Sequence, residues 1–247
     1  MTIVILAAGY ATRLYPLTLN KPKPLLPVGG KPILEHIFDK ISELNNVGNC
    51  YIVTNQKFFK DFKDWAGTFK FKAPIEAIND ETTTNENRLG AIRDIEFAIK
   101  KKGIKDDLLV IGGDNLFEFS LKGFVNFAEA HKPSSSLAIF DIGEKEKASL
   151  YGVIKIDSSS QVVNFEEKPP KPQSTFIATC VYYFPGEKVN LISKFLSSSN
   201  KSDAPGNYIK WLSENEEVYG FAFKEKWYDI GDKSSYEQAG RGYKAEK

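Results

Sequence analysis

The sequence predicts an α/β protein built on a doubly wound sheet, and two observations indicate this fold class. Residues 3–8 form a continuously apolar run, which suits a strand buried on both faces of a parallel sheet. Strand-like runs then alternate with helical stripes, an order typical of doubly wound sheets. The further strands of this half are expected at residues 51–53, 75–78 and 108–111, and the helices at residues 33–44, 58–65 and 89–99.

Strands dominate the chain after about His131. No linker separates this second half from the first, so we expect it to form a lobe on the same sheet rather than an independent domain. Residues 197–205 are the segment that we expect to be a mobile loop. The strands are expected at residues 137–142, 152–156, 162–165, 176–184 and in a final run at 218–230, with helices at 189–196 and around 208–212.

Composition excludes several classes of function. The chain has 247 residues and a formal net charge of +1, so no global field draws it to nucleic acid or to a membrane. No apolar stretch reaches membrane-spanning length and no signal-peptide pattern is present, so we expect a cytoplasmic protein. The two cysteines, Cys50 and Cys180, lie in apolar runs and are expected to be buried, reduced thiols.

The strongest motif is the turn that follows the first strand. Residues 6–9 end that strand in small side chains, which lets backbone N–H groups approach a phosphate closely. Arg13 then offers a forked cation and Lys23 a point charge to a triphosphate. The alternative is a tight turn with solvated cations. Neither a Walker A motif nor a dinucleotide-binding glycine motif is present.

Two aspartates are candidate metal ligands. Asp114 follows the strand at residues 108–111 and two glycines, so it lies where open α/β sheets present their ligands. A carboxylate there suits Mg²⁺, which takes few protein oxygens and completes its shell with phosphate and water. Asp229 is the second candidate. The alternative for either residue, taken alone, is a cap or turn residue.

These segments resemble the sugar nucleotidyltransferases, also called NDP-sugar pyrophosphorylases. Residues 6–27 are similar to the family's signature L-A-G/A-G-x-G-T-R-L-x-P-L-T followed by K-P-x-x-P. Gly113-Asp114-Asn115 resembles its metal-binding G-D-N, and residues 227–231 resemble its closing W-x-D-x-G. Residues 151–153 and 166–169 resemble the Y-G-V and E-K-P segments of its sugar site. The motifs occur in the family's order over most of the chain.

The resemblance implies a Rossmann-like doubly wound mixed sheet. It implies a single nucleotidyltransferase domain, residues 1–247, with a nucleotide-binding half at 1–131 and a β-rich sugar-phosphate-binding half at 132–247. The partners it implies are an NTP and a sugar 1-phosphate, and the cofactor is Mg²⁺. An oxygen of the sugar phosphate would attack the α-phosphorus in line and pyrophosphate would leave. A phosphate monoester is already anionic, so no protein base is needed, and neither His36 nor His131 is assigned a role.

The resemblance also assigns residues to roles. Arg13 and Lys23 would stabilise charge during catalysis, while Asp114 and Asp229 would hold the metal. Glu167 would accept hydrogen bonds from sugar hydroxyls, and Lys168 beside it would hold the sugar phosphate. The nucleotide-binding residues would be Leu6, Ala7, Ala8, Gly9, Asn85 and Gly90, and the sugar-phosphate-binding residues Tyr151, Gly152, Glu167, Lys168 and Thr179.

Four departures from the family pattern leave the substrates open. Ala11 stands where a second glycine is usual, and Asn85 replaces a longer glutamine in the base-reading segment. Residues 80–84 look like an insertion, and Asp232 replaces a frequent threonine. Neither the nucleobase nor the sugar is predicted, and homo-oligomer formation is left open. Two alternatives remain: a cytidylyltransferase for a non-sugar phosphate such as phosphocholine, and a catalytically silent regulatory homologue that only binds nucleotide.

Overall fold

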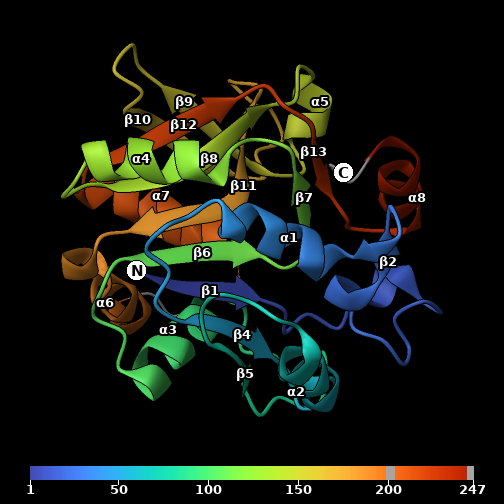
Figure 1. Cartoon of the computed structure of the whole chain (residues 1–247). Helices are drawn as coiled ribbons and strands as arrows, with labels where there is room; N and C mark the ends of the chain where they lie inside the picture. Colours follow the sequence, from blue (N-terminus) through green and yellow to red (C-terminus); the bar gives the residue numbers. More distant parts are fainter. Residues whose placement is uncertain (199–203, 244–247) are drawn as a thin grey trace.

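The computed structural model describes residues 1–198 and 204–243, and a nine-stranded mixed sheet runs through it (Figure 1). The strands follow the order β10-β9-β11-β6-β1-β4-β5, while β8 pairs with both β11 and β12. The parallel strands of the first half are β1 (Thr2–Leu6), β4 (Cys50–Thr54), β5 (Ile75–Asn79) and β6 (Leu108–Gly112). The doubly wound α/β prediction is confirmed.

Successive residues of β1 enter two different cores, which explains why that strand is apolar throughout. Ile3 and Ile5 pack in the core on the side of α1 and α4, whereas Val4 packs in the core on the side of α3. Each of the three side chains is fully buried. The helices of this half are α1 (Ile33–Ser42), α2 (Phe59–Thr68), α3 (Ala91–Lys102) and α4 (Leu121–Ala130).

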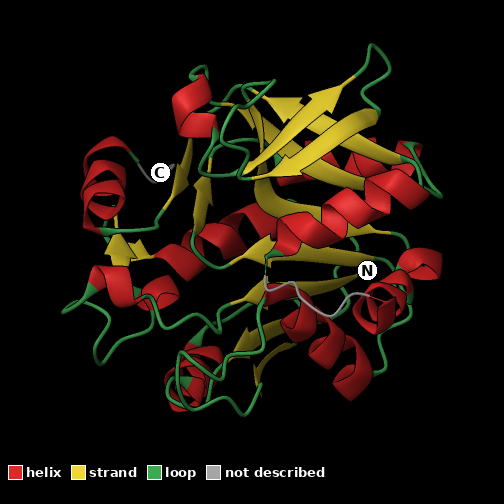
Figure 2. Cartoon of the chain, turned by 180° about the vertical axis from the view of Figure 1, so that it is seen from behind, coloured by secondary structure: helices red, strands yellow, loops and turns green. Residues whose placement is uncertain are grey.

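The second half extends the same sheet. Strand β11 (Phe176–Phe184) pairs antiparallel with β6, with Val181 opposite Ile111. From behind, the strands of this half gather above the helices and strands of the first half (Figure 2). The other elements are β8 (Ser135–Asp141), β9 (Gly152–Ile156), β10 (Val162–Glu167) and β12 (Val218–Phe223), with α5 (Lys145–Ala148), α6 (Leu191–Ser198) and α7 (Pro205–Asn215).

Several elements were not expected from the sequence. The run at residues 218–230 is two strands, because β13 (Trp227–Asp229) leaves the main sheet and pairs with β7 (Asn115–Phe117). Helix α8 (Lys233–Gly242) follows it, and β2 (Pro27–Val28) and β3 (Lys31–Pro32) form a second small ribbon. Of the loop expected at residues 197–205, residues 199–203 lie outside the described part of the chain. Among the described helices, none has the length and apolar character needed to cross a bilayer.

Candidate active site

The site lies where the order of the strands along the sheet reverses. After β1 the chain continues to β4 on one side, whereas β6 pairs with the other edge of β1. The Gly113 amide donates a hydrogen bond to the Leu6 carbonyl oxygen, 2.9 Å away. A Cβ at Gly113 would lie only 2.7 Å from that oxygen, so the close approach requires glycine. The phosphate-loop candidate and Asp114 therefore lie side by side at the carboxyl ends of two strands.

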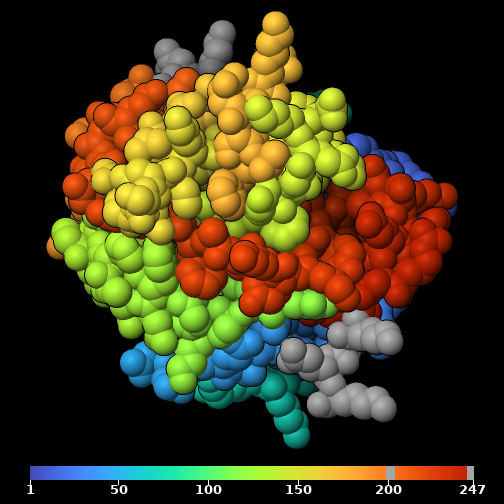
Figure 3. Space-filling view, turned by 90° about the horizontal axis from the view of Figure 1, so that it is seen from above, coloured from blue at the N-terminus to red at the C-terminus, as the bar shows by residue number. Residues whose placement is uncertain are grey.

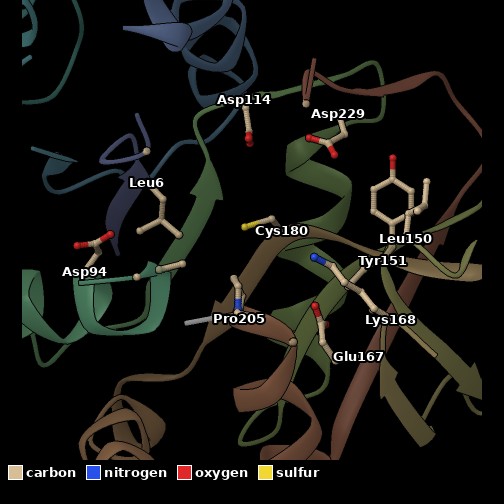
Figure 4. A pocket seen from close by; sticks show the side chains of 18 of the residues that line it. Leu6, Asp94, Asp114, Leu150, Tyr151, Glu167, Lys168, Cys180, Pro205 and Asp229 are labelled. Atoms are coloured by element: carbon tan, nitrogen blue, oxygen red, sulfur yellow. The ribbon is translucent and has the colours of Figure 1, made fainter. Parts of the chain in front are cut away.

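A cavity of about 820 Å³ opens at this edge. In Figure 4, Leu6 and Asp94 lie on one side of it, Tyr151, Glu167 and Lys168 on the other, and Asp114 and Asp229 along its upper edge. Both halves of the chain thus contribute to one wall. Of the residues assigned to roles from the sequence, the cavity is lined by Leu6, Ala8, Gly9, Arg13, Gly90, Asp114, Tyr151, Gly152, Glu167, Lys168 and Asp229.

The loop after β1 carries both the cation and a strained residue. Arg13 is exposed to the cavity from a single helical turn at Thr12–Leu14. Ala11, which precedes that turn, has a φ of 49°, in the left-handed region that favours glycine. Ala7 does not line the cavity. It is only 4% exposed and its amide donates to the Val53 carbonyl, so it anchors the end of β1 instead.

Lys23 forms an ion pair with Asp114 at the acidic centre. Its ammonium donates to Asp114 Oδ2 at 2.7 Å and to the Ile230 carbonyl oxygen at 2.8 Å. The side chain is 15% exposed and does not line the cavity. The cation assigned to the triphosphate from sequence is therefore paired with a carboxylate in this structure, whereas Arg13 is the one that faces the cavity.

The two aspartates are brought together by the ribbon of β7 and β13. Asp229 lies opposite Asn115, and the Ile230 amide donates to the Asp114 carbonyl oxygen at 3.2 Å. Viewed from above, the red C-terminal segment lies against green and yellow-green residues from the middle of the chain (Figure 3). Burial and the charge of Asp114 raise the pKa of Asp229 to about 6, against the opposing charges of Lys23 and Arg13.

The donor set at this centre fits a magnesium ion. Two carboxylates face one cavity, and the raised pKa of Asp229 shows that the second negative charge is costly there without a further cation. Within residues 1–198 and 204–243, no cluster of three or more His, Cys, Asp or Glu side chains is placed to hold a metal. Mg²⁺ accepts few protein oxygens when phosphate and water supply the rest, which matches a two-carboxylate site.

Glu167 and Lys168 line the side of the cavity opposite Leu6 (Figure 4). Glu167 ends β10, and burial raises the pKa of its carboxyl despite the neighbouring charge of Lys168. Lys168 has a φ of 45°, and its amide donates to the Tyr151 carbonyl oxygen at 3.0 Å. Burial, with the charge of Asp229, raises the pKa of Tyr151 to about 12, so its phenol stays protonated.

Two assigned residues lie elsewhere. Thr179 is 1% exposed and its hydroxyl donates to the Ala138 carbonyl on β8, so it points into the sheet and away from the cavity. The β11 residues that line the cavity are Ala178, Cys180 and Tyr182. Asn85 also lies off the wall. Arg88, which does line the cavity, donates to the backbone carbonyl and side-chain oxygen of Asn85 at 3.1 and 3.3 Å.

The structure accounts for two of the unexplained segments. Asp232 caps α8: its Oδ1 accepts from the Ser235 amide at 2.8 Å, and the Ser235 hydroxyl accepts from the Asp232 amide at 3.0 Å. The segment at residues 80–84 is an ordered turn, because Asp80 Oδ1 accepts from both the amide and the hydroxyl of Thr82. Burial raises the pKa of Asp80.

Other lining residues gave no signal in the sequence. Asp94 is a buried carboxyl in the first turn of α3, where a polar residue of an amphipathic helix is ordinary. Cys180 has a φ of 58° and lies in an apolar strand, which suggested only core packing. The remaining lining residues not assigned from sequence are Arg88, Ala91, Ser149, Leu150, Ala178, Tyr182, Ala204, Pro205, Gly206, Gly231, Asp232 and Ser235.

The fold and cavity define an α/β protein with a candidate phosphate loop and paired carboxylates at a strand switch point. The sequence profile of the nucleotidyl transferase family matches residues 2–246, so the chain belongs to the nucleotidyl transferase family. The family resemblance inferred from the motifs is confirmed.

Individual relatives agree. The bifunctional protein GlmU of Methanocaldococcus jannaschii is 32% identical over 94% of this chain and 51% of its own length. A Sulfolobus acidocaldarius protein assigned as a mannose-1-phosphate guanyltransferase is 29% identical over 96% of this chain and 61% of its own. The chain thus spans about half the length of the GlmU relatives that it matches.

Two solved structures show the same fold. One is a Bacillus anthracis protein assigned as a glucose-1-phosphate thymidylyltransferase, crystallised with sucrose. It has a TM-score of 0.82 at 22% identity over 100% of this chain and 98% of its own. The other is a UDP-glucose pyrophosphorylase with UDP-glucose, with a TM-score of 0.81 at 20% identity over 98% and 97% of the two chains. At these identities the likeness establishes the architecture alone.

Proposed function

We propose that the protein transfers a nucleoside monophosphate from an NTP to a sugar 1-phosphate and releases pyrophosphate. The observation that carries this proposal is the set of side chains that one cavity brings together. The phosphate-loop residues Gly9 and Arg13, the two aspartates, and the Glu167–Lys168 pair all line it. The names of the mannose-1-phosphate and glucose-1-phosphate relatives support the choice of a sugar phosphate.

Arg13 would meet the phosphates of the NTP. A Cβ on Gly231 would lie 3.7 and 3.8 Å from its two terminal nitrogens, and that glycine also lines the cavity beside Asp229. The guanidinium therefore extends from the loop after β1 to the acidic centre. A planar, permanently charged fork there stabilises the negative charge that a transferring phosphoryl group distributes over its oxygens.

The acceptor would lie at the other end of the cavity. Glu167 would accept hydrogen bonds from ring hydroxyls, and Lys168 would hold the phosphate with its oxygen aimed at the α-phosphorus. That oxygen forms the new bond as the bond from the α-phosphorus to the bridging oxygen breaks, and pyrophosphate carries the electron pair away. The monoester is anionic at neutral pH, so catalysis here consists of alignment and charge stabilisation.

Asp114 and Asp229 are the residues that would hold Mg²⁺. When bound, the ion would supply neutralisation of phosphate charge and a fixed orientation for the substrates. The Lys23 ammonium donates one hydrogen bond to Asp114, which holds that side chain in place, and a second one to the Ile230 carbonyl. The lysine would therefore serve the centre as a second cation behind the carboxylates.

The decisive experiment is a panel of the common NTPs against several hexose 1-phosphates, read out as pyrophosphate release with Mg²⁺. Phosphocholine and a no-acceptor reaction belong in the same panel. Release that depends on a sugar 1-phosphate supports the proposal, and preference for phosphocholine would assign the acceptor to the other class. Nucleotide binding without release for any acceptor would identify a silent homologue. The cytoplasmic location stays a prediction, and homo-oligomer formation stays open.

A further inference from the structure

We infer that Gly206 is a positioning residue for the acceptor carboxylate: its missing side chain is what allows Glu167 to reach its place on the cavity wall. This inference rests on the proposed function of Glu167. Gly206 lies in the first turn of α7, and Glu167 is the last residue of β10. Both line the cavity.

The space at Gly206 is taken by the carboxylate itself. A Cβ built on Gly206 would lie 1.7 Å from Glu167 Oε2 and 2.7 Å from Glu167 Cδ, both far below any real contact. A Cβ on Gly152 would lie 3.1 Å from the same oxygen. The carboxylate therefore lies close to two glycines, one in α7 and one in β9. Any side chain at Gly206 must displace it.

Two positive charges near this point offset part of the cost of burying the Glu167 carboxylate. Helix α7 runs for 11 residues with Pro205 in its first turn, and the amino end of a helix carries a partial positive charge that stabilises a nearby anion. Lys168 adds a full positive charge on the next residue of the chain. These charges oppose the burial that raises the pKa of Glu167, and the absence of a Cβ at Gly206 leaves room for its carboxylate.

Gly206 and Gly152 differ in what a side chain would strike. At Gly152 the nearest atom is Cζ of Phe165, 2.5 Å away, which belongs to a fully buried ring. At Gly206 the nearest atoms are the end of a flexible glutamate, and the ring of Phe165 is 3.1 Å away. Substitution at Gly152 therefore disturbs the core, whereas alanine at Gly206 chiefly moves the carboxylate.

The test is Gly206→Ala, with Gly67→Ala as the matched control. Gly67 lies within α2, and a Cβ there would meet nothing within 4 Å. We expect Gly206→Ala to raise the KM for the sugar 1-phosphate about tenfold or more, the effect of losing hydrogen bonds to a charged acceptor. The KM for the NTP and the Tm should stay near the wild-type values. Gly67→Ala should leave both KM values unchanged and should not lower the Tm, because alanine favours a helix more than glycine does.

A double-variant cycle shows whether Gly206→Ala changes the acceptor KM through Glu167. If Gly206 acts through Glu167, adding Gly206→Ala to Glu167→Ala should change the acceptor KM by a factor near one. In the Gly206→Ala background, Glu167→Asp should improve acceptor binding, because the shorter side chain avoids the new methyl group, whereas it should weaken binding in the wild-type background. If Gly206→Ala alone destabilises the fold, restoration of Tm by Glu167→Ala would reveal the same collision.

The outcomes separate this inference from the proposed function. An unchanged acceptor KM in Gly206→Ala, while Glu167→Ala raises it, would overturn the positioning role alone. A rise in KM, or a loss of Tm, that persists undiminished in the Glu167→Ala background would overturn it as well. An acceptor KM that Glu167→Ala leaves at the wild-type value would instead contradict the assignment of Glu167 to the acceptor.

Discussion

The ammonium nitrogen of Lys23 lies 2.7 Å from Asp114 Oδ2, and it also bonds the Ile230 carbonyl next to Asp229. One cation thus joins the ends of the two segments that carry the aspartates. Lys23 and Arg13, which the sequence pairs as phosphate-binding cations, therefore have different environments: Lys23 is largely buried behind the centre and Arg13 is exposed in front of it. The two residues are expected to respond differently to substitution.

Lys23→Ala should lower both turnover and stability, whereas Arg13→Ala should lower turnover alone. Removing Lys23 leaves Asp114 and the Ile230 carbonyl without their partner, at a cost of about 1–3 kcal/mol in the free energy of unfolding. For both variants kcat should fall more than acceptor binding weakens, because Arg13 is assigned to the NTP phosphates and Lys23 supports Asp114 at the metal centre. Urea titrations and steady-state kinetics measure the two effects. A lysine variant that raises only the acceptor KM would move Lys23 to the acceptor site.

Asp114→Ala and Asp229→Ala should each lose most turnover while the fold persists. Loss of a metal ligand at a phosphoryl-transfer site costs several kcal/mol, and each ~1.4 kcal/mol is tenfold in rate. Pyrophosphate release across a Mg²⁺ titration measures this, with circular dichroism as the control for folding. Near wild-type turnover at ordinary Mg²⁺ concentrations would remove that aspartate from the site.

A hexose 1-phosphate should be used at least about tenfold more efficiently than phosphocholine, because a desolvated Glu167 without its hydroxyl partners costs about 1–3 kcal/mol. Glu167→Ala should penalise the sugar substrate far more than the NTP. A quaternary ammonium calls instead for an aromatic cage. The nearby Tyr151 and Trp227 rings pack edge to face with centroids 5.6 Å apart. Equal kcat/KM for phosphocholine, unaffected by Glu167→Ala, would overturn the sugar assignment.

Ala11→Gly should raise the free energy of unfolding by about 0.5–1 kcal/mol. Ala11 has a φ of 49°, and a left-handed conformation costs a non-glycine residue roughly 1–2 kcal/mol, offset in part by the greater freedom of glycine in the unfolded chain. A urea titration measures the change. Ala98→Gly, in the middle of α3, is the control and should destabilise the protein. A lower urea midpoint for Ala11→Gly than for the wild type would contradict the prediction that Ala11 is strained.

Asp107→Asn should destabilise the protein at pH 7 by about 1–2 kcal/mol, less in acid. Burial opposes the charge of Asp107, but hydrogen bonds from Lys132, Tyr183 and the Gly186 amide outweigh it, so its pKa is lowered. A lowered folded-state pKa stabilises the fold above the unfolded value of about 3.9, and that contribution is lost as pH falls through the folded pKa. Unfolding curves at pH 7 and below pH 4 test this. If the difference in unfolding free energy between the wild type and Asp107→Asn does not shrink in acid, the charge of Asp107 is not its cause.

The periodic parts of the fold were predictable because they depend on local pattern. The strands of the parallel half and the helices between them follow from apolar runs and helical stripes, and each lies within a few residues of its expected place. The ribbon of β7 and β13 was not predictable, because three-residue strands carry no periodicity and these two pair across 112 residues of sequence.

The candidate site was predictable as a set of residues but not as contacts. Spacing placed Lys23 in a cationic loop, yet its partner is a carboxylate that only the folded sheet brings near. Thr179 was assigned by resemblance, whereas the strand's alternation turns it inward next to a bulge between Ala178 and Tyr182. Gly206 carries no signal at all, because a glycine near a helix start is ordinary until its neighbour is known.

The β7–β13 ribbon has a consequence for biosynthesis. Trp227 bonds Asn115 across 112 residues of sequence, so a growing chain holds Asp114 at the end of a finished strand long before its partner aspartate is made. The parallel half can gather around β1 as it emerges, but the acidic centre closes only when the last strand arrives. A chain arrested before β13 is therefore expected to retain much of the nucleotide-binding wall yet lack a complete catalytic centre.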